Sequence, residues 1–190
     1  MTRTMPILRD LLLATALLGV LLLIAARLDT GKETDMRGPF HVIDGDTLSA
    51  GGERLRLLGI DAPELHQICK DAEGRDWRCG SAARMGLIRL VEAGDVECRG
   101  RARDRYHRLL VECRRGADSI NGRMVREGLA VASGGYEHEE AEAQQARQGL
   151  WAGEFERPRQ WRDEHARTKE ADPLEGFWDW LKEKLGRTAI

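Results

Sequence analysis

Residues 40–64, FHVIDGDTLSAGGERLRLLGIDAPE, decide the fold of this chain. Two largely apolar segments, Phe40–Leu48 and Arg54–Ile60, have residue types that are typical of β-strands. Between them lies Ala-Gly-Gly, a sequence that favours a tight turn. The pattern therefore predicts a β-hairpin that turns near Gly51.

Charged side chains converge at one end of this predicted hairpin. Asp46 and Arg56 are equally far from Gly51, so a turn centred there would place them opposite each other. The second strand then leads directly into Asp61 and Glu64. Carboxylate oxygens are the ligands that a hard cation such as Ca²⁺ prefers, and an arginine fork binds phosphoryl oxygens. The set has the components of hydrolytic phosphoryl transfer, although each feature alone is also compatible with an ordinary turn or ion pair.

The rest of the chain predicts short strands with one inserted helix, followed by two more helices. Helical spacing is found over 81–93, 118–127 with Asp118 as cap, and 138–148; strand patterns are found over 96–100, 109–114 and 129–132; residues 65–80 form a loop. This order fits an α+β protein built on an OB-fold, a five-stranded Greek-key β-barrel with three helices, preceded by an N-terminal hydrophobic helix.

The N-terminal region differs in composition from the remainder. Residues 11–26 are uncharged and apolar or small, and arginines precede them, which favours a cytoplasmic segment over 1–10. We interpret 11–26 as an uncleaved transmembrane anchor, with a cleaved signal peptide as the alternative. A polar linker over 27–38 would follow. The folded domain would then lie on the extracytoplasmic side, or be secreted after cleavage.

Four cysteines agree with an exported protein. Their spacings are too wide for paired zinc knuckles, which leaves disulfides as the favoured interpretation. Cys98 and Cys113 are symmetric about a turn at Arg105–Tyr106, so a hairpin there would make them cross-strand neighbours. Cys69 and Cys79 would then form the second bond.

Several motifs resemble the staphylococcal nuclease-like (thermonuclease) family: VIDGDTL, RLRLLGIDAPE, DRYHR, NGRMVREGLA and GLWAGEF. The resemblance runs from Phe40 to Trp161 within a domain over 39–161, and leaves a charged, Trp-containing extension over 162–190. It implies an OB-fold and calcium-dependent endonuclease cleavage of DNA and/or RNA that leaves 3′-phosphate and 5′-hydroxyl ends. By this resemblance Asp46, Asp61 and the backbone carbonyl of Ala62 would bind Ca²⁺.

The same resemblance implies roles for further residues. Glu64 would be the general base or orient the attacking water, and Asp44 would support the turn. Arg56 and Arg108 would bind the phosphoryl oxygens. The remaining contacts to the nucleotide would come from three residues: Arg105, Tyr106 and Tyr136.

Two departures from the family pattern concern substrate binding. His107 stands where the family usually has glycine, and Gly134 replaces a family tyrosine, which leaves Tyr136 as the neighbouring candidate. The formal net charge is −2, but seven arginines lie between residues 99 and 115, so the near-neutral total conceals a basic hairpin suited to nucleic acid. The expected protein is a monomer. The alternative functions are a catalytically silent nucleic-acid- or protein-binding module at the membrane, and a membrane-anchored assembly factor.

Overall fold

The computed structural model describes residues 4–28 and 33–171. The chain divides into two compact units, residues 1–34 and 35–190. The described element of the first unit is the helix α1 (Thr4–Leu28). Among the residues that the structure describes, no helix is both long and apolar enough to cross a membrane. The predicted anchor over 11–26 is therefore not shown by the described residues and stays a prediction.

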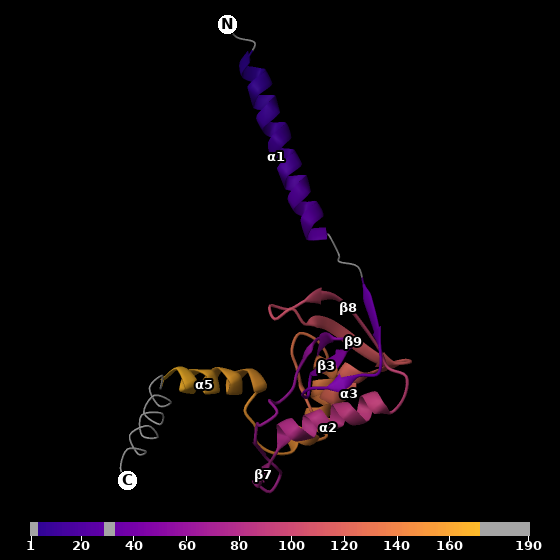
Figure 1. The fold of residues 1–190 in the computed structure, drawn as a ribbon. Coiled ribbons are helices and arrows are strands. Elements are labelled where there is room, and N and C mark those ends of the chain that lie inside the picture. Colours follow the sequence, from indigo (N-terminus) through magenta and orange to yellow (C-terminus); the bar gives the residue numbers. More distant parts are fainter. Residues whose placement is uncertain (1–3, 29–32, 172–190) are drawn as a thin grey trace, which may run out of the picture. The chain divides into compact units, whose positions relative to one another are not determined.

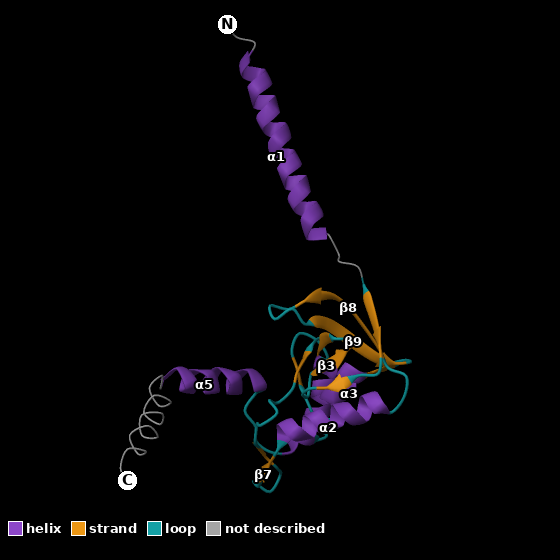
Figure 2. Ribbon diagram, in the orientation of Figure 1, coloured by secondary structure: helices purple, strands orange, loops and turns teal. Residues whose placement is uncertain are grey.

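The described residues of the second unit form a curled sheet of seven strands, which Figures 1 and 2 show. Its strands follow the order β1-β8-β9-β4-β3-β2, with β10 paired to β9. β4 and β9 run parallel, and the pairs β2–β3, β3–β4, β8–β9 and β9–β10 are antiparallel. The bounds are β1 (Thr34–Arg37), β2 (His41–Val42), β3 (Thr47–Ala50), β4 (Glu53–Leu57), β8 (Glu97–Arg103), β9 (Leu109–Arg115) and β10 (Asp118–Ser119).

Two small sheets lie beside the main one. One pairs β5 (Ile60–Asp61) with β11 (Val131–Ala132), and the other pairs β6 (Cys69–Lys70) with β7 (Asp76–Trp77). The β6–β7 hairpin lies inside the segment predicted as a loop. Its strands are only two residues long, too short to give a periodic pattern in the sequence.

The helices of this unit are α2 (Cys79–Glu92), α3 (Ile120–Arg126), α4 (Glu137–Gln145), the 3-10 helix η1 (Gly149–Ala152) and α5 (Pro158–Ala171). α2 and α3 pack together beside the sheet (Figure 1). The N-cap of α3 is Ser119, whose hydroxyl accepts the Gly122 N–H, and not Asp118 as predicted. Asp118 instead lies in β10 and forms ion pairs with Arg115 and Arg123.

The predicted first hairpin is present, with a register that differs by one residue. Thr47, not Asp46, is opposite Arg56, because the turn contains two residues, Gly51 and Gly52. Both have positive φ values, 57° and 83°, which glycine adopts without steric cost. The Asp46 carbonyl accepts the Leu57 N–H at 2.8 Å, so the hairpin still holds Asp46 beside β4.

The predicted strand Phe40–Leu48 is divided by a turn. Its ends form β2 and β3, which pair with each other, and residues 43–46 connect them. The Ile43 N–H closes this turn on the Thr47 carbonyl at 2.9 Å. The two aspartates of the DGD motif therefore lie in a turn at the strand junction instead of within one continuous strand.

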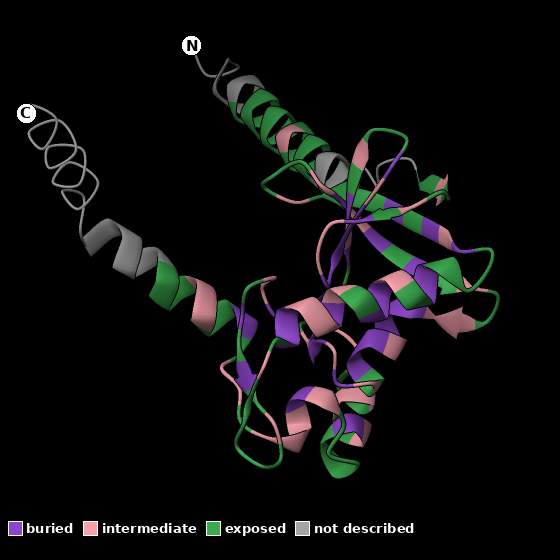
Figure 3. Ribbon diagram, turned by 60° about the horizontal axis from the view of Figure 1, so that its bottom comes forward, coloured by how far each residue is buried: buried purple, intermediate pink, exposed green. Residues whose placement is uncertain are grey.

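The main core lies between the curled sheet and the helices α2 and α3. Buried aliphatic residues from β3, β4 and β9 form one cluster with residues from both helices. Figure 3 colours the buried segments of the ribbon purple. Among the largest buried side chains are Leu48, Leu55, Leu57, Leu87, Val111, Ile120 and Met124. Burial of a side chain of this size contributes about 1.5–3 kcal/mol, so this core keeps the strand ends that carry the site in place.

Both predicted disulfides are present. Cys98 and Cys113 are directly opposite each other on β8 and β9, and Cys69 on β6 is joined to Cys79 at the start of α2. A disulfide of this kind typically contributes about 2–4 kcal/mol to stability. The described part of the chain contains no free cysteine.

The architecture is mixed α and β with a curled, partly closed sheet, which is consistent with the OB-like fold that was predicted. The five-stranded count is not confirmed, because the main sheet has seven strands in the described chain and β1 and β10 extend its edges. The predicted helices are present as α2, α3 and α4. The Trp-containing segment at 177–181 lies outside the described residues.

Candidate active site

A buried pair of aspartates is bridged by one arginine at the junction of β3, β4 and β5. Arg56 Nη1 donates to Asp46 Oδ1 at 2.7 Å, and Arg56 Nη2 donates to Asp61 Oδ1 at 2.8 Å. The two aspartates are only 4% and 6% exposed. The planar guanidinium uses both of its terminal nitrogens, which a lysine ammonium could not reproduce.

The DGD turn brings Asp46 against the strand that carries Asp61. Asp44 Oδ1 accepts the Asp46 N–H at 3.0 Å, and Asp46 Oδ2 accepts the Ala62 N–H at 3.1 Å. Gly45 lies between Asp44 and Asp46 in the sequence, and it packs so closely that an added Cβ would lie 2.6 Å from the Ala62 Cβ. Only glycine permits this approach, which explains the DGD sequence at this turn.

Glu64 follows Asp61 on an ordered turn. The Glu64 N–H donates to Gln67 Oε1 at 3.1 Å, and the Gln67 N–H donates to the Glu64 carbonyl at 2.7 Å. Gln67 is fully buried and its Nε2 also donates to the Glu156 carbonyl at 2.7 Å. The backbone of Glu64 is therefore fixed, while its side chain is 36% exposed and accessible to water.

Arg108 reaches the same cluster from the β8–β9 turn. It forms an ion pair with Asp104 at 2.7 Å, and its Nη1 donates to the Thr47 hydroxyl at 3.3 Å. That hydroxyl in turn donates to Asp46 Oδ1 at 3.0 Å. Thr47 thus links Arg108 to the Asp46 carboxylate, which Arg56 also binds. Thr47 was not predicted as a site residue, although it directly follows the DGD motif.

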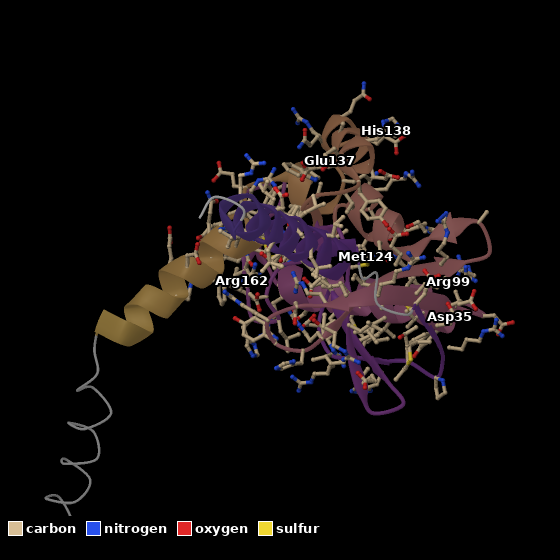
Figure 4. The ribbon with its side chains drawn as sticks, turned by 90° about the horizontal axis from the view of Figure 1, so that it is seen from above. Asp35, Arg99, Met124, Glu137, His138 and Arg162 are labelled. Atoms are coloured by element: carbon tan, nitrogen blue, oxygen red, sulfur yellow. A yellow bond between two sulfur atoms is a disulfide. The ribbon has the colours of Figure 1, made fainter. Side chains whose placement is uncertain are left out.

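A further residue of the cluster, Arg162, comes from α5 and was not predicted. Its Nη2 donates to Asp61 Oδ2 at 2.9 Å and Oδ1 at 3.1 Å, and its Nη1 donates to Glu64 Oε1 at 2.8 Å. It lies 98 residues after Glu64 in a charged segment without a recognisable motif, so no local signal marks it. Figure 4 labels Arg162 where α5 meets the rest of its unit.

The outer candidates lie at the rim of the site or away from it. Tyr106 is 63% exposed at the tip of the β8–β9 turn, with the Arg105 guanidinium 4.7 Å from its ring centre. The contacts of Tyr136 lead elsewhere: its ring packs on Gly59 and its hydroxyl lies 3.5 Å from the Ser119 hydroxyl. No described contact joins Tyr136 to the carboxylates, so a role in substrate binding stays a prediction.

The departure from the family pattern at His107 has a backbone explanation. His107 has φ 63°, the left-handed conformation that glycine adopts most easily. The Asp104 side chain stabilises this turn by accepting the Tyr106 N–H at 2.9 Å and the Arg108 N–H at 3.0 Å. Histidine therefore occupies a backbone conformation that glycine adopts most easily.

The electrostatics of the pair are dominated by burial. Loss of hydration raises the pKa of Asp46 to about 6, because burial disfavours the charged carboxylate more than the Arg56 guanidinium favours it. Arg162 is affected in the opposite sense. Partial burial acts to lower its pKa, but the bonds to Asp61 and Glu64 outweigh this, and its pKa is raised. The charge of the Asp46 carboxylate is thus only partly compensated, whereas the Arg162 guanidinium stays charged.

The raised pKa of Asp46 predicts a pH-dependent stability. The folded pKa of about 6 exceeds the ordinary value of roughly 4, so the native state binds the proton more tightly between these values. The stabilising contribution is complete below the lower value and is lost as pH rises through about 6. Asp46→Asn lacks this titrating group. In a buffer free of divalent cations, we therefore expect the unfolding free energy of Asp46→Asn minus that of wild type to rise by about 1–2 kcal/mol from pH 4.5 to pH 7. Urea unfolding of both proteins at the two pH values measures this difference, and a constant difference would contradict it.

The donor chemistry fits a hard cation. Asp46 and Asp61 supply buried oxygen ligands. Arg56 only partly offsets the burial of the Asp46 carboxylate, and a bound cation would add the missing positive charge. Within the described residues, no group of three or more His, Cys, Asp or Glu side chains is arranged to hold a metal. Two carboxylates would therefore act together with backbone, water or substrate oxygens, and Asp46 and Asp61 are the residues that would hold the ion.

Residues 54–153 match the profile of a family described as staphylococcal nuclease homologue. This chain belongs to that family. It is 30% identical over 163 residues to an uncharacterized endonuclease of Haemophilus influenzae, an alignment that covers 80% of this chain and 84% of the relative. It is also 37% identical over 105 residues to the succinoglycan biosynthesis protein ExoI of Rhizobium meliloti, covering 54% of this chain and 55% of that protein.

The matched region covers only part of the charged cluster. It begins on β4, before Arg56, and contains Asp61, Glu64 and Arg108. The profile ends at residue 153, so Arg162 on α5 lies beyond it. The nuclease-homologue region therefore contains Arg56, Asp61, Glu64 and Arg108, while Asp46 lies before it and Arg162 after it.

Proposed function

We propose that this chain is a Ca²⁺-dependent endonuclease that hydrolyses DNA and/or RNA to 3′-phosphate and 5′-hydroxyl ends. One observation carries the proposal: two buried aspartates, a solvent-accessible glutamate and two arginines converge on one site. Membership in the nuclease-homologue family and the similarity to a relative named endonuclease support this function. The all-oxygen donors of Asp46 and Asp61 suit a hard cation, and the choice of Ca²⁺ follows the resemblance to the family.

The chemistry assigns a task to each group. Glu64 accepts a proton from a water molecule as the water oxygen attacks the phosphorus. The bond from phosphorus to the 5′-oxygen breaks, and that oxygen leaves with a proton from solvent. Arg56 and Arg108 donate hydrogen bonds to the non-bridging oxygens as negative charge accumulates on them. A bound cation supplies further charge neutralisation at the phosphoryl group.

The substrate approaches from the turn that carries Arg108. Arg105 and Tyr106 lie beside it and are suited to a phosphate contact and to stacking on a base. Several arginines of the β8–β9 hairpin have acidic partners: Arg99 is paired with Glu97 and Asp35, and Arg103 with Glu53. The basic hairpin is thus partly neutralised, and Arg105 is the residue we expect to contact the polyanion.

The two disulfides are typical of an extracytoplasmic protein, since the cytosol of most organisms keeps thiols reduced. We therefore propose that the nuclease acts outside the cytoplasm. A monomeric state stays a prediction.

Removal of the cation should abolish activity. We expect the full-length chain to cleave single-stranded DNA or RNA in Ca²⁺, and to lose at least about 100-fold in rate in EGTA, because the uncompensated phosphoryl charge raises the barrier. Re-addition of Ca²⁺ should restore the rate. Gel analysis of end-labelled oligonucleotides measures cleavage, and a mobility shift after phosphatase treatment identifies 3′-phosphate ends.

Two outcomes would oppose this proposal in different ways. Undiminished cleavage in EGTA would contradict the dependence on a divalent cation. Binding of the oligonucleotide without cleavage, in Ca²⁺ and at high protein concentration, would instead support the alternative of a silent binding module.

A further inference from the structure

The C-terminal helix α5 contributes a charged group to the site from outside the family-matched region. Three hydrogen bonds of Arg162 end on two carboxylates, both Oδ atoms of Asp61 and Oε1 of Glu64. The side chain of Arg162 is 38% exposed, so it is partly buried and partly in contact with solvent. Such charge-assisted bonds are among the stronger polar contacts in proteins.

The start of α5 is anchored by packing and by backbone bonds. Phe155 packs edge-to-face on Trp151, within a small second core built around the Cys69–Cys79 disulfide. The Lys70 N–H donates to the Glu154 carbonyl at 2.8 Å, and buried Gln67 holds the Glu156 carbonyl. Pro158, the first residue of α5, is buried. These contacts fix the start of α5 and thereby place Arg162 beside the carboxylates of Asp61 and Glu64.

The bonds of Arg162 divide the Glu64 carboxylate into two different oxygens. Oε1 accepts the Arg162 hydrogen bond. Within the described residues, Oε2 accepts none, so it keeps both lone pairs for water. A glutamate side chain that is 36% exposed would otherwise sample several rotamers. Pairing with Arg162 restricts it to those that keep Oε2 directed away from the guanidinium.

We propose that Arg162 is a positioning residue of this site, which holds Glu64 by Oε1 so that Oε2 orients the attacking water. This inference rests on the proposed nuclease function and deepens it, because it makes α5 part of the active site. Arg162 acts through Glu64 and contributes no group to the phosphorus itself. The opposing possibility is that Arg162 competes with the cation for Asp61, in which case its removal would increase activity.

The test compares Arg162→Gln, Arg162→Lys and Arg159→Gln in the full-length chain. Arg159 is exposed on the same helix, so its substitution makes the same change in net charge away from the cluster. At saturating Ca²⁺, we expect Arg162→Gln to lower kcat about 10- to 100-fold with KM within about twofold, as is typical for loss of a group that orients a catalytic ligand. Arg162→Lys should recover part of kcat, and Arg159→Gln should match wild type.

A double-mutant cycle with Glu64→Gln separates positioning from other roles. If Arg162 acts through Glu64, Arg162→Gln should lower kcat by less than about twofold in the Glu64→Gln background. Equal losses in both backgrounds, an unchanged kcat in Arg162→Gln, or a faster Arg162→Gln enzyme would each overturn the inference while leaving the proposed function intact. Absence of cleavage by wild type would refute the function itself and the inference with it.

The same cycle in unfolding free energy, measured by urea denaturation, checks the ion pair without reference to activity. Non-additive losses for the two substitutions would support the Arg162–Glu64 contact in solution. Additive losses would contradict it, whatever the kinetic result.

Discussion

Arg56→Ala should reduce cleavage by about 1,000-fold or more, because it removes a donor to the transition-state phosphoryl group and leaves two buried carboxylates without their shared partner. Asp46 and Asp61 both accept hydrogen bonds from Arg56 at 2.7 and 2.8 Å. Removal of one partner from a buried ion pair typically destabilises a protein by about 3–5 kcal/mol, so the variant should also unfold more easily. The rate of oligonucleotide cleavage and the urea midpoint measure the two effects.

Two further variants interpret the Arg56 result. Arg54→Ala changes an exposed arginine on the same strand and should leave rate and stability near wild type. Arg56→Lys keeps the charge but cannot donate to both aspartates at once, so we expect a loss of about 100-fold with most of the stability retained. Full activity of Arg56→Ala in a protein shown to be folded by circular dichroism would disprove the proposed mechanism.

Glu64→Gln should lower kcat by about 100- to 10,000-fold with little change in stability. The substitution retains size and hydrogen bonding but removes the ability to accept a proton from water. The fold should tolerate it, since the Glu64 side chain is 36% exposed and its backbone is held by Gln67. KM should change little, because the phosphate contacts of Arg56 and Arg108 remain.

The matched control for this variant is Glu73→Gln. Glu73 is another glutamate whose carboxylate pairs with a single arginine, Arg75 at 2.7 Å, but it lies on an exposed turn away from the cluster. We expect its kcat to equal that of wild type. A Glu64→Gln enzyme with wild-type kcat would exclude Glu64 as general base and would require another proton acceptor.

The sequence predicted those parts of the site that depend on local order along the chain. The turn at Gly51 indicated that Asp46 and Arg56 would meet, and they do, despite a register that differs by one residue. The long arginine side chain tolerates this shift because it reaches across the strand pair. The symmetry of the second hairpin likewise predicted the Cys98–Cys113 bond, since cross-strand pairing depends only on the position of the turn.

Other features could not be derived from local pattern. The turn that divides 40–48 into β2 and β3 places Gly45 against Ala62, a tertiary contact that a local sequence pattern does not show. The raised pKa of Asp46 is likewise a result of burial, which composition does not reveal. The anchor predicted from the N-terminal apolar run is not found among the described residues.

By itself, the sequence determined the β3–β4 and β8–β9 hairpins, the disulfide pairing and the convergence of Asp46, Arg56, Asp61 and Glu64, because turns and short spacings bring those groups together. Only the tertiary structure decided that Thr47 links two arginines and that Arg162 reaches Asp61 and Glu64. The reason is physical: contacts over some 60 to 100 residues depend on how the sheet curls and where the small second core anchors α5.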